Sequence, residues 1–189
     1  MKEKEQPRVL YLENPARYHP ERQKEETKRG EILRTRLSSV GYDLTYRPHY
    51  ILDTSFVDHD VFLSQYHLLI THLFAHRFGQ GSDYSPALAR VRTLLQTHEN
   101  THHQPLPAIV YTGASLKYIS DEDIKKGIER QIKNAPVEVV RKSDNLDRDV
   151  KKIDRALESL LQEHYLPLFL SSKVRQFIKR GFSRFSAVF

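Results

Sequence analysis

Short apolar runs alternate along the chain with longer stretches in which apolar residues recur at helical spacing. Each short run predicts a buried strand. The five predicted strands are residues 8–13, 43–47, 67–72, 107–112 and 137–140. In the third strand Leu68, Leu69 and Ile70 are contiguous rather than alternating, which is typical of a sheet covered on both faces.

Each predicted strand is followed by a predicted helix. These helices span residues 21–40, 55–65, 86–98, 120–133 and 146–164. The apolar face of the first helix comprises Ile32, Leu33, Leu37 and Val40. Gly41 follows it as a typical C-cap glycine. Residues 75–84 contain two glycines, and we expect a mobile loop there.

Five strand–helix repeats predict an α/β fold, a doubly wound parallel five-stranded sheet with helices on both faces. The chain has 189 residues, which suits one domain with an appendage better than two domains. We expect a disordered N-terminus over residues 1–7, a single domain over 8–165 and a C-terminal extension over 166–189. In such sheets the functional residues lie at the carboxyl ends of the strands.

Composition narrows the function classes. Cysteine is absent, which excludes disulfides, thiol nucleophiles and thiolate metal sites and fits a cytoplasmic location. No stretch approaches the ~20 apolar residues of a transmembrane segment. The net charge is +6, yet acidic and basic residues alternate over most of the chain. Only residues 173–189 are one-sided, with five Lys or Arg and no acid.

Polar residues stand at four of the predicted strand ends. They are Glu13 and Asn14, Thr71 and His72, Thr112, and Lys142. In this order they resemble the phosphorylation site of a response-regulator receiver domain. That family has an acidic pair after its first strand, a Thr or Ser after its fourth and a Lys after its fifth. The resemblance covers residues ~8–163 and implies a flavodoxin-like sheet of order 2-1-3-4-5.

The chain departs from the family at two of these positions. In the family the acidic pair holds Mg²⁺, and an Asp after the third strand accepts a phosphoryl group. Here Asn14 replaces the second acid, and Thr71-His72 stands where that Asp would be. We therefore expect a degenerate form, a pseudo-receiver without aspartyl phosphorylation. Glu13 is expected to form a structural ion pair with Lys142 rather than to bind a metal.

The ten histidines do not form a recognisable metal motif. His98, His102 and His103 lie close in sequence, as do His72 and His76, but HExxH is missing. We expect His102 and His103 in a histidine-rich solvated loop after a helix that His98 closes. Gly-x-Ser-x-Gly and the Walker motif are also missing. We expect no catalytic residue, no metal site, no cofactor and no enzymatic activity.

The C-terminal extension combines apolar residues at helical spacing with basic residues between them. Its predicted interaction residues are Lys173, Arg175, Phe177, Ile178, Lys179, Arg180, Phe182, Arg184 and Phe185. Three uses stay open: docking on the domain or on a second copy in a homodimer, binding an anionic membrane surface, and binding nucleic acid. The favoured function is a regulatory module with a protein partner in two-component signalling. The alternative is a basic nucleic-acid-binding regulatory protein.

Overall fold

The structure, a computed structural model, describes residues 6–13, 20–47, 65–73, 76–78, 81–102, 106–129 and 136–165. Its strands are β1 (Arg8–Leu12), β2 (Asp43–Arg47), β3 (Leu68–Thr71), β4 (His76–Phe78), β5 (Gly81–Asp83), β6 (Ala108–Thr112) and β7 (Val137–Arg141). Its helices are α1 (Pro20–Ser39), α3 (Ser85–His102), α4 (Asp121–Glu129) and α5 (Leu146–Tyr165). The five predicted strands and four of the five predicted helices are present in the predicted order, and two unpredicted strands, β4 and β5, stand between β3 and α3.

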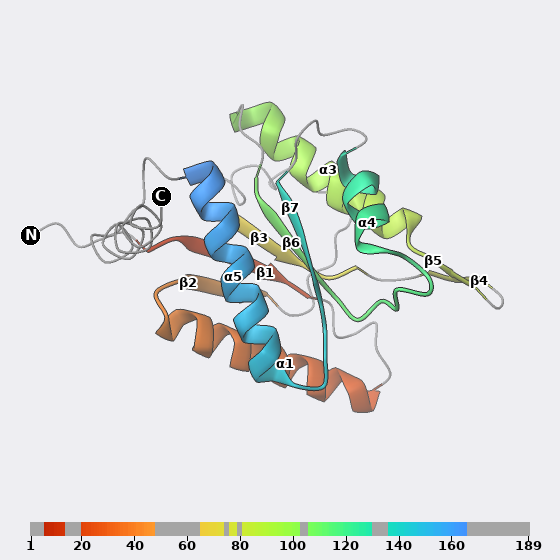
Figure 1. The fold of residues 1–189 in the computed structure, drawn as a ribbon, viewed down its shortest axis with the longest axis horizontal. Coiled ribbons are helices and arrows are strands. Elements are labelled where there is room, and N and C mark those ends of the chain that lie inside the picture. Colours follow the sequence, from red (N-terminus) through yellow and green to blue (C-terminus); the bar gives the residue numbers. More distant parts are fainter. Residues whose placement is uncertain are drawn as a thin grey trace, which may run out of the picture.

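Five of the strands form one parallel sheet in the order β2-β1-β3-β6-β7 (Figure 1). This order places β1 in the interior of the sheet and reverses the winding direction between β1 and β3, as in flavodoxin-like folds. The predicted doubly wound five-stranded sheet and its strand order are thus confirmed.

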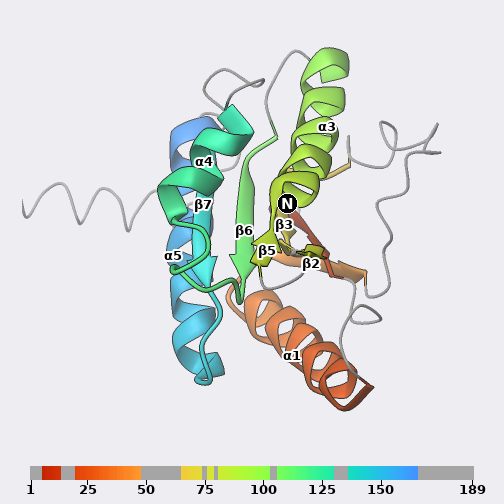
Figure 2. The same cartoon turned by 90° about the vertical axis from the view of Figure 1, so that its right-hand side faces the viewer.

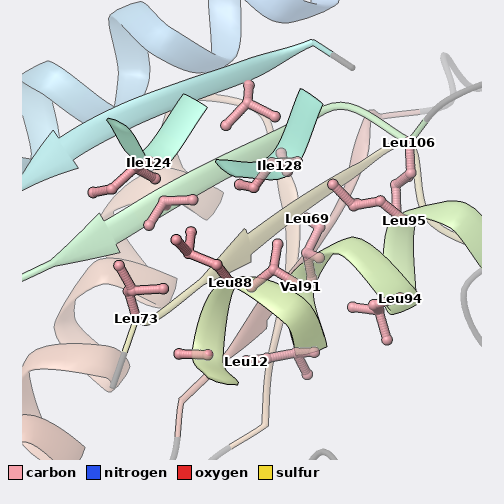
Figure 3. Packing of buried hydrophobic residues seen from close by; sticks show 14 of the residues in the cluster. Leu12, Leu69, Leu73, Leu88, Val91, Leu94, Leu95, Leu106, Ile124 and Ile128 are labelled. Carbon is pink, nitrogen blue, oxygen red and sulfur yellow. The ribbon is translucent and has the colours of Figure 1, made fainter. Parts of the chain in front are cut away.

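Helices cover both faces of the sheet, and each face has its own core. α1 and α5 pack on one face with Leu33, Leu37, Ile153 and Leu157 buried, and α3 and α4 pack on the other. Figure 2 shows α1 and α3 on opposite sides of the strands. The α3–α4 core is almost entirely aliphatic and includes Leu88 (Figure 3). The buried ion pairs described below lie on the α1–α5 side of the sheet.

α1 ends at Ser39, and Gly41 caps it as the sequence predicts. This residue has a φ of 110°, a left-handed conformation that favours glycine. The N–H of Tyr42 donates to the carbonyl of Leu37, and the N–H of Gly41 donates to that of Ser38, which is a Schellman cap. Val40 was predicted on the buried face but is 58% exposed, because the cap turns the chain away from the helix.

Residues 75–84 do not form the simple loop that their glycines predict. β4 and β5 pair antiparallel, with Phe78 opposite Gly81, and make a hairpin beside the main sheet (Figure 1). Two strands of three residues are too short to show an alternating pattern in sequence, so the glycines alone were informative. α3 likewise continues past His98 to His102.

Several expected segments lie outside the described residues. They include residues 55–64 of the expected second helix, residues 1–5 of the N-terminus and residues 166–189 of the C-terminal extension. The predicted helix over residues 120–133 is described as far as Glu129. No helix in the described part of the chain is long and apolar enough to cross a membrane.

Candidate functional site

The carboxyl ends of β1, β3 and β7 bring three predicted site residues together. Leu12 pairs with Thr71 in the sheet, so Glu13 and His72 are the next residues on neighbouring strands. Lys142 follows β7 in the same way. The carboxyl ends of parallel strands lie on the same side of the sheet. The side chains at positions 13, 72 and 142 therefore lie close together although they are far apart in sequence.

Lys142 lies between two buried carboxylates. Its Nζ is 2.8 Å from Oε2 of Glu13 and 2.8 Å from Oε2 of Glu26. The side chains of Lys142, Glu13 and Glu26 are 6%, 0% and 5% exposed. The ion pair predicted between Glu13 and Lys142 is thus confirmed, and a second carboxylate from α1 joins it. We call Glu13, Glu26 and Lys142 the carboxylate–lysine triad.

Two tyrosines enclose this triad. The hydroxyl of Tyr11 donates a 2.8 Å hydrogen bond to Oε2 of Glu13. The ammonium group of Lys142 stands 5.0 Å from the ring centroid of Tyr111, a cation–π distance. Burial, followed by the negative charge of Glu13, raises the pKa of Tyr11 well above its usual value. Tyr11 therefore stays protonated and serves as a hydrogen-bond donor.

His72 completes the site as a buried, neutral imidazole. Burial, assisted by the charge of Lys142 and opposed by Glu13, lowers its pKa to about 4. Its Nδ1 lies 2.9 Å from the carbonyl oxygen of Tyr111, so in the neutral ring Nδ1–H donates to that carbonyl. The same nitrogen is 4.0 Å from Oε2 of Glu13. His72 is therefore held by the backbone of β6 and carries no charge at neutral pH.

Glu13 is ionised despite its burial. Burial alone would raise its pKa, but cationic charge at His72 and Lys142 and hydrogen bonds from Lys142 and Tyr11 outweigh that effect. The net result is a pKa below the usual value. At neutral pH Lys142 is the cation that matters, because His72 is then neutral. The triad thus holds two carboxylates and one ammonium in a site with little access to water.

A second polar network lies beside the triad, around Asp149 of α5. This carboxylate is fully buried and accepts hydrogen bonds from Arg29 at 2.9 Å and from the hydroxyl of Tyr111 at 2.7 Å. The backbone N–H of Ser143 also donates to it, at 3.0 Å, and the Ser143 hydroxyl at 2.7 Å. The network ties α1, β6 and the start of α5 together.

Two predicted site residues do not join the triad. The hydroxyl of Thr112 receives a hydrogen bond from the N–H of Ala114 at 3.1 Å and lies 3.4 Å from the carbonyl of Leu73. Side chains alternate along a strand, so Thr112 faces the α3–α4 side while Tyr111 faces the triad. Thr71 is buried within β3. Thr112 therefore shapes the β6–α4 loop instead of facing Lys142.

Other predicted residues lie outside the described part of the chain. They are Asn14 and the nine interaction residues of the C-terminal extension, Lys173, Arg175, Phe177, Ile178, Lys179, Arg180, Phe182, Arg184 and Phe185. Their assignments stay predictions.

Sequence reasoning missed the residues that α1 and α5 supply. Glu26 and Arg29 stand on α1, and Asp149 stands on α5. Positions 26, 30, 33 and 37 continue the apolar stripe of α1 at helical spacing, and all four are buried. A glutamate on the buried stripe of a helix was therefore the available signal that Glu26 points inward.

Of the three neighbouring histidines at positions 98, 102 and 103, His98 and His102 lie in α3, and His103 lies outside the described residues. His98 is buried within α3, at 5% exposure, and His102 is the last residue of the same helix. His98 is buried because it lies in α3, which packs on the aliphatic core. Among the described residues, no group of three His, Cys, Asp or Glu side chains is placed to hold a metal ion.

Comparisons with known proteins assign no family to this chain. No protein-family model matches this chain, and no curated protein matches it. A crystal structure of a response regulator from Desulfuromonas acetoxidans is similar at 15% sequence identity and a TM-score of 0.44. The match covers 82% of this chain and 98% of that chain. The strand order by itself identifies the chain as an α/β protein with a flavodoxin-like five-stranded parallel sheet.

Proposed function

We propose that this chain is a non-enzymatic regulatory module with a receiver-like fold. It acts in bacterial-type signalling through protein–protein interaction and does not accept a phosphoryl group. The observation that supports the proposal most is the carboxylate–lysine triad. In the receiver domains that the sequence resembles, the Lys after the fifth strand contacts phosphoryl oxygens. In this chain Lys142 is engaged by two buried carboxylates.

The position of the phosphoryl acceptor also argues against phosphorylation. His72 stands where the resemblance places an Asp, and its Nδ1 is hydrogen-bonded to the carbonyl of Tyr111. Phosphoryl transfer requires charge neutralisation around the transferred group. The only nearby ammonium that the resemblance provides for this purpose, Lys142, is already neutralised by Glu13 and Glu26.

A protein-binding role is supported by the loop between β6 and α4. Leu116 and Tyr118 are 64% and 52% exposed, although both side chains are large and apolar or aromatic. Arg141 donates hydrogen bonds to the carbonyls of Ala114 and Ile119, which hold this loop against β7. A rigid loop that presents apolar side chains loses little conformational entropy on binding. It adjoins the face of α4, β7 and α5 through which receiver domains commonly signal.

Treatment with acetyl phosphate and Mg²⁺ tests the absence of phosphorylation. We expect the intact mass of the wild-type chain to stay unchanged. The variant His72→Gln serves as the matched control, because it removes the imidazole and keeps a neutral polar side chain. A phosphoryl group on the wild type that is absent from His72→Gln would contradict the proposal and identify His72 as the acceptor.

Nucleic-acid binding is the second candidate function. It is favoured by the five Lys or Arg and the missing acids of residues 173–189. Binding driven by phosphate contacts weakens steeply as the salt concentration rises. Retention of single- or double-stranded DNA or RNA at low salt, lost on truncation after residue 167, would favour this candidate. No retention at low salt would reject it.

A further inference from the structure

The carboxylate–lysine triad has the arrangement of an occupied cation site. Glu13 follows β1 and Glu26 stands in the second turn of α1, so the two carboxylates come from different elements. Each directs its Oε2 atom at the same point, the Nζ of Lys142, at 2.8 Å. The position that a bound cation would take between two carboxylates is therefore filled by a side chain of the same molecule.

We propose that Glu13 and Glu26 form a cation site whose native occupant is the ammonium group of Lys142, and that this site accepts a divalent cation once the ammonium is removed. The inference rests on this geometry and is independent of the proposed function. Hard divalent cations take carboxylate oxygens as ligands at roughly 2.0–2.6 Å. The carboxylates need to approach by only a fraction of an ångström for such a cation to replace the ammonium.

The burial of Glu13 and Glu26 requires a cation between their carboxylates. Both carboxylates are at most 5% exposed, and a buried anion without a counter-charge is strongly unfavourable. Arg22 contacts Glu26 at 3.6 Å, but its side chain is 59% exposed and belongs to the surface. Lys142 is thus the cation placed between the two carboxylates.

A buried hydroxyl beside the triad points to the same conclusion. The hydroxyl of Tyr46 is inaccessible to solvent and has no hydrogen-bond partner among the described residues. Its ring stacks on that of Tyr11 at 5.0 Å and presses on Gly30, one turn after Glu26. Burial raises the pKa of Tyr46, and the charges of Glu13, Glu31 and Glu26 add to this effect. An unpaired hydroxyl whose ring stacks on Tyr11, the hydrogen-bond donor to Glu13, is suited to bind a water ligand of a hydrated cation.

The native consequence is a closed connection between α1 and the sheet that needs no metal. A bound Mg²⁺ or Ca²⁺ can dissociate and so can regulate, whereas a tethered ammonium cannot leave. The wild-type chain should therefore have the same melting temperature in EDTA as in millimolar Mg²⁺ or Ca²⁺.

The experiment replaces Lys142 by methionine, which keeps the length of the side chain and removes its charge. Tb³⁺ serves as a probe for Ca²⁺, because nearby tyrosines sensitise its luminescence and Tyr11 and Tyr111 lie against the triad. The matched control is Lys125→Met, which removes a half-exposed lysine paired with Glu138 on the surface. The double variant Lys142→Met/Glu26→Gln removes one carboxylate of the site.

We expect Lys142→Met to bind Tb³⁺ and Ca²⁺, with a Kd for Ca²⁺ on the order of 0.1–1 mM, as in weak sites with few carboxylates. Its melting temperature should rise with Ca²⁺, while those of wild type and Lys125→Met should not. The double variant should lose the binding. Lys142→Gln, whose amide can still donate to the carboxylates, provides a second test if Lys142→Met does not fold in EDTA.

Three results would overturn the proposal. The first is a folded Lys142→Met or Lys142→Gln variant that binds no cation. The second is cation binding that persists in Lys142→Met/Glu26→Gln. The third is failure of both single variants to fold in EDTA and in Ca²⁺ alike, since a divalent cation would then not replace the ammonium.

Discussion

The hydroxyl of Tyr111, near the end of the interior strand β6, donates a 2.7 Å hydrogen bond to Oδ2 of Asp149 in the first turn of α5. The same oxygen accepts from Arg29 of α1 at 2.9 Å. Asp149 is fully buried, so three elements depend on one ionised carboxylate. This network and the carboxylate–lysine triad share Tyr111, whose ring lies under the ammonium group of Lys142.

Replacing Asp149 by alanine should strongly destabilise the fold. The change leaves Arg29 and the hydroxyl of Tyr111 without their shared acceptor, and breaking a buried pair costs about 3–5 kcal/mol. The control is Asp147→Ala in the same helix turn, where an exposed carboxylate pairs with Arg36 on the surface. That surface pair should contribute less than ~1 kcal/mol. Urea unfolding measures the loss of unfolding free energy in both variants. Equal losses would show that Asp149 stabilises the fold only by its charge at the N-terminus of α5.

Stability should fall as the pH decreases from about 6.5 towards 4. The His72 pKa is lowered to about 4 in the folded chain, so between these values the unfolded chain binds the extra proton. The lowered pKa of Glu13 acts in the same direction, since its stabilising charge is lost on acidification. His72 alone should contribute about 3 kcal/mol of this dependence.

Urea unfolding at several pH values between 7.5 and 4.5 measures this effect. The variant His72→Gln has no titratable ring and should show a smaller decrease in unfolding free energy over the same range. A wild type and a variant with parallel pH profiles would show that His72 does not titrate differently in the folded and unfolded chains.

The fold was accessible from sequence because its signals are local. Contiguous apolar residues such as Leu68 to Ile70 predict a buried strand, and Gly41 marks the end of a helix. Glu13 and Lys142 were also found, because strand ends in a parallel sheet meet at one edge. The partner Glu26 was not found, since its inward direction depends on how α1 is rotated against the sheet. Asp149 was missed for the same reason, because it lies on a helix and not at a strand end.

Gly30→Ala should destabilise the chain although alanine favours a helix. A Cβ atom at position 30 would overlap Cζ of Tyr46, whose ring is stacked on Tyr11. Overpacking of this kind costs about 1–3 kcal/mol, which exceeds the helix-propensity gain of about 1 kcal/mol. The control Gly113→Ala meets its nearest atoms at 4.0 Å and should be nearly neutral. Adding Tyr46→Leu to Gly30→Ala should recover part of the lost unfolding free energy, because the smaller side chain makes room for the Cβ atom. If the effects of the two substitutions on the unfolding free energy simply add, the steric contact is not the cause.

The exposed loop between β6 and α4 should determine partner binding without affecting the fold. Leu116→Ser and Tyr118→Ser remove the two exposed large side chains of this loop, and Val40→Ser is the matched control after α1. Loops after the ends of parallel strands and after the ends of their helices lie at opposite edges of the sheet, so Val40 is far from the loop. The free energy of unfolding of all three variants, measured in urea, should equal that of wild type within ~0.5 kcal/mol.

Affinity capture from an extract of the source cell, followed by quantitative mass spectrometry, measures the interaction. A protein retained by wild type and by Val40→Ser should be lost, by about tenfold or more for a central contact residue, from Leu116→Ser or Tyr118→Ser. Arg141→Met should weaken the same interaction indirectly, because Arg141 holds the loop through the carbonyls of Ala114 and Ile119. If every retained protein binds all four variants equally, this loop is not the binding surface, and the apolar exposure of Leu116 and Tyr118 is an ordinary feature of a solvated turn.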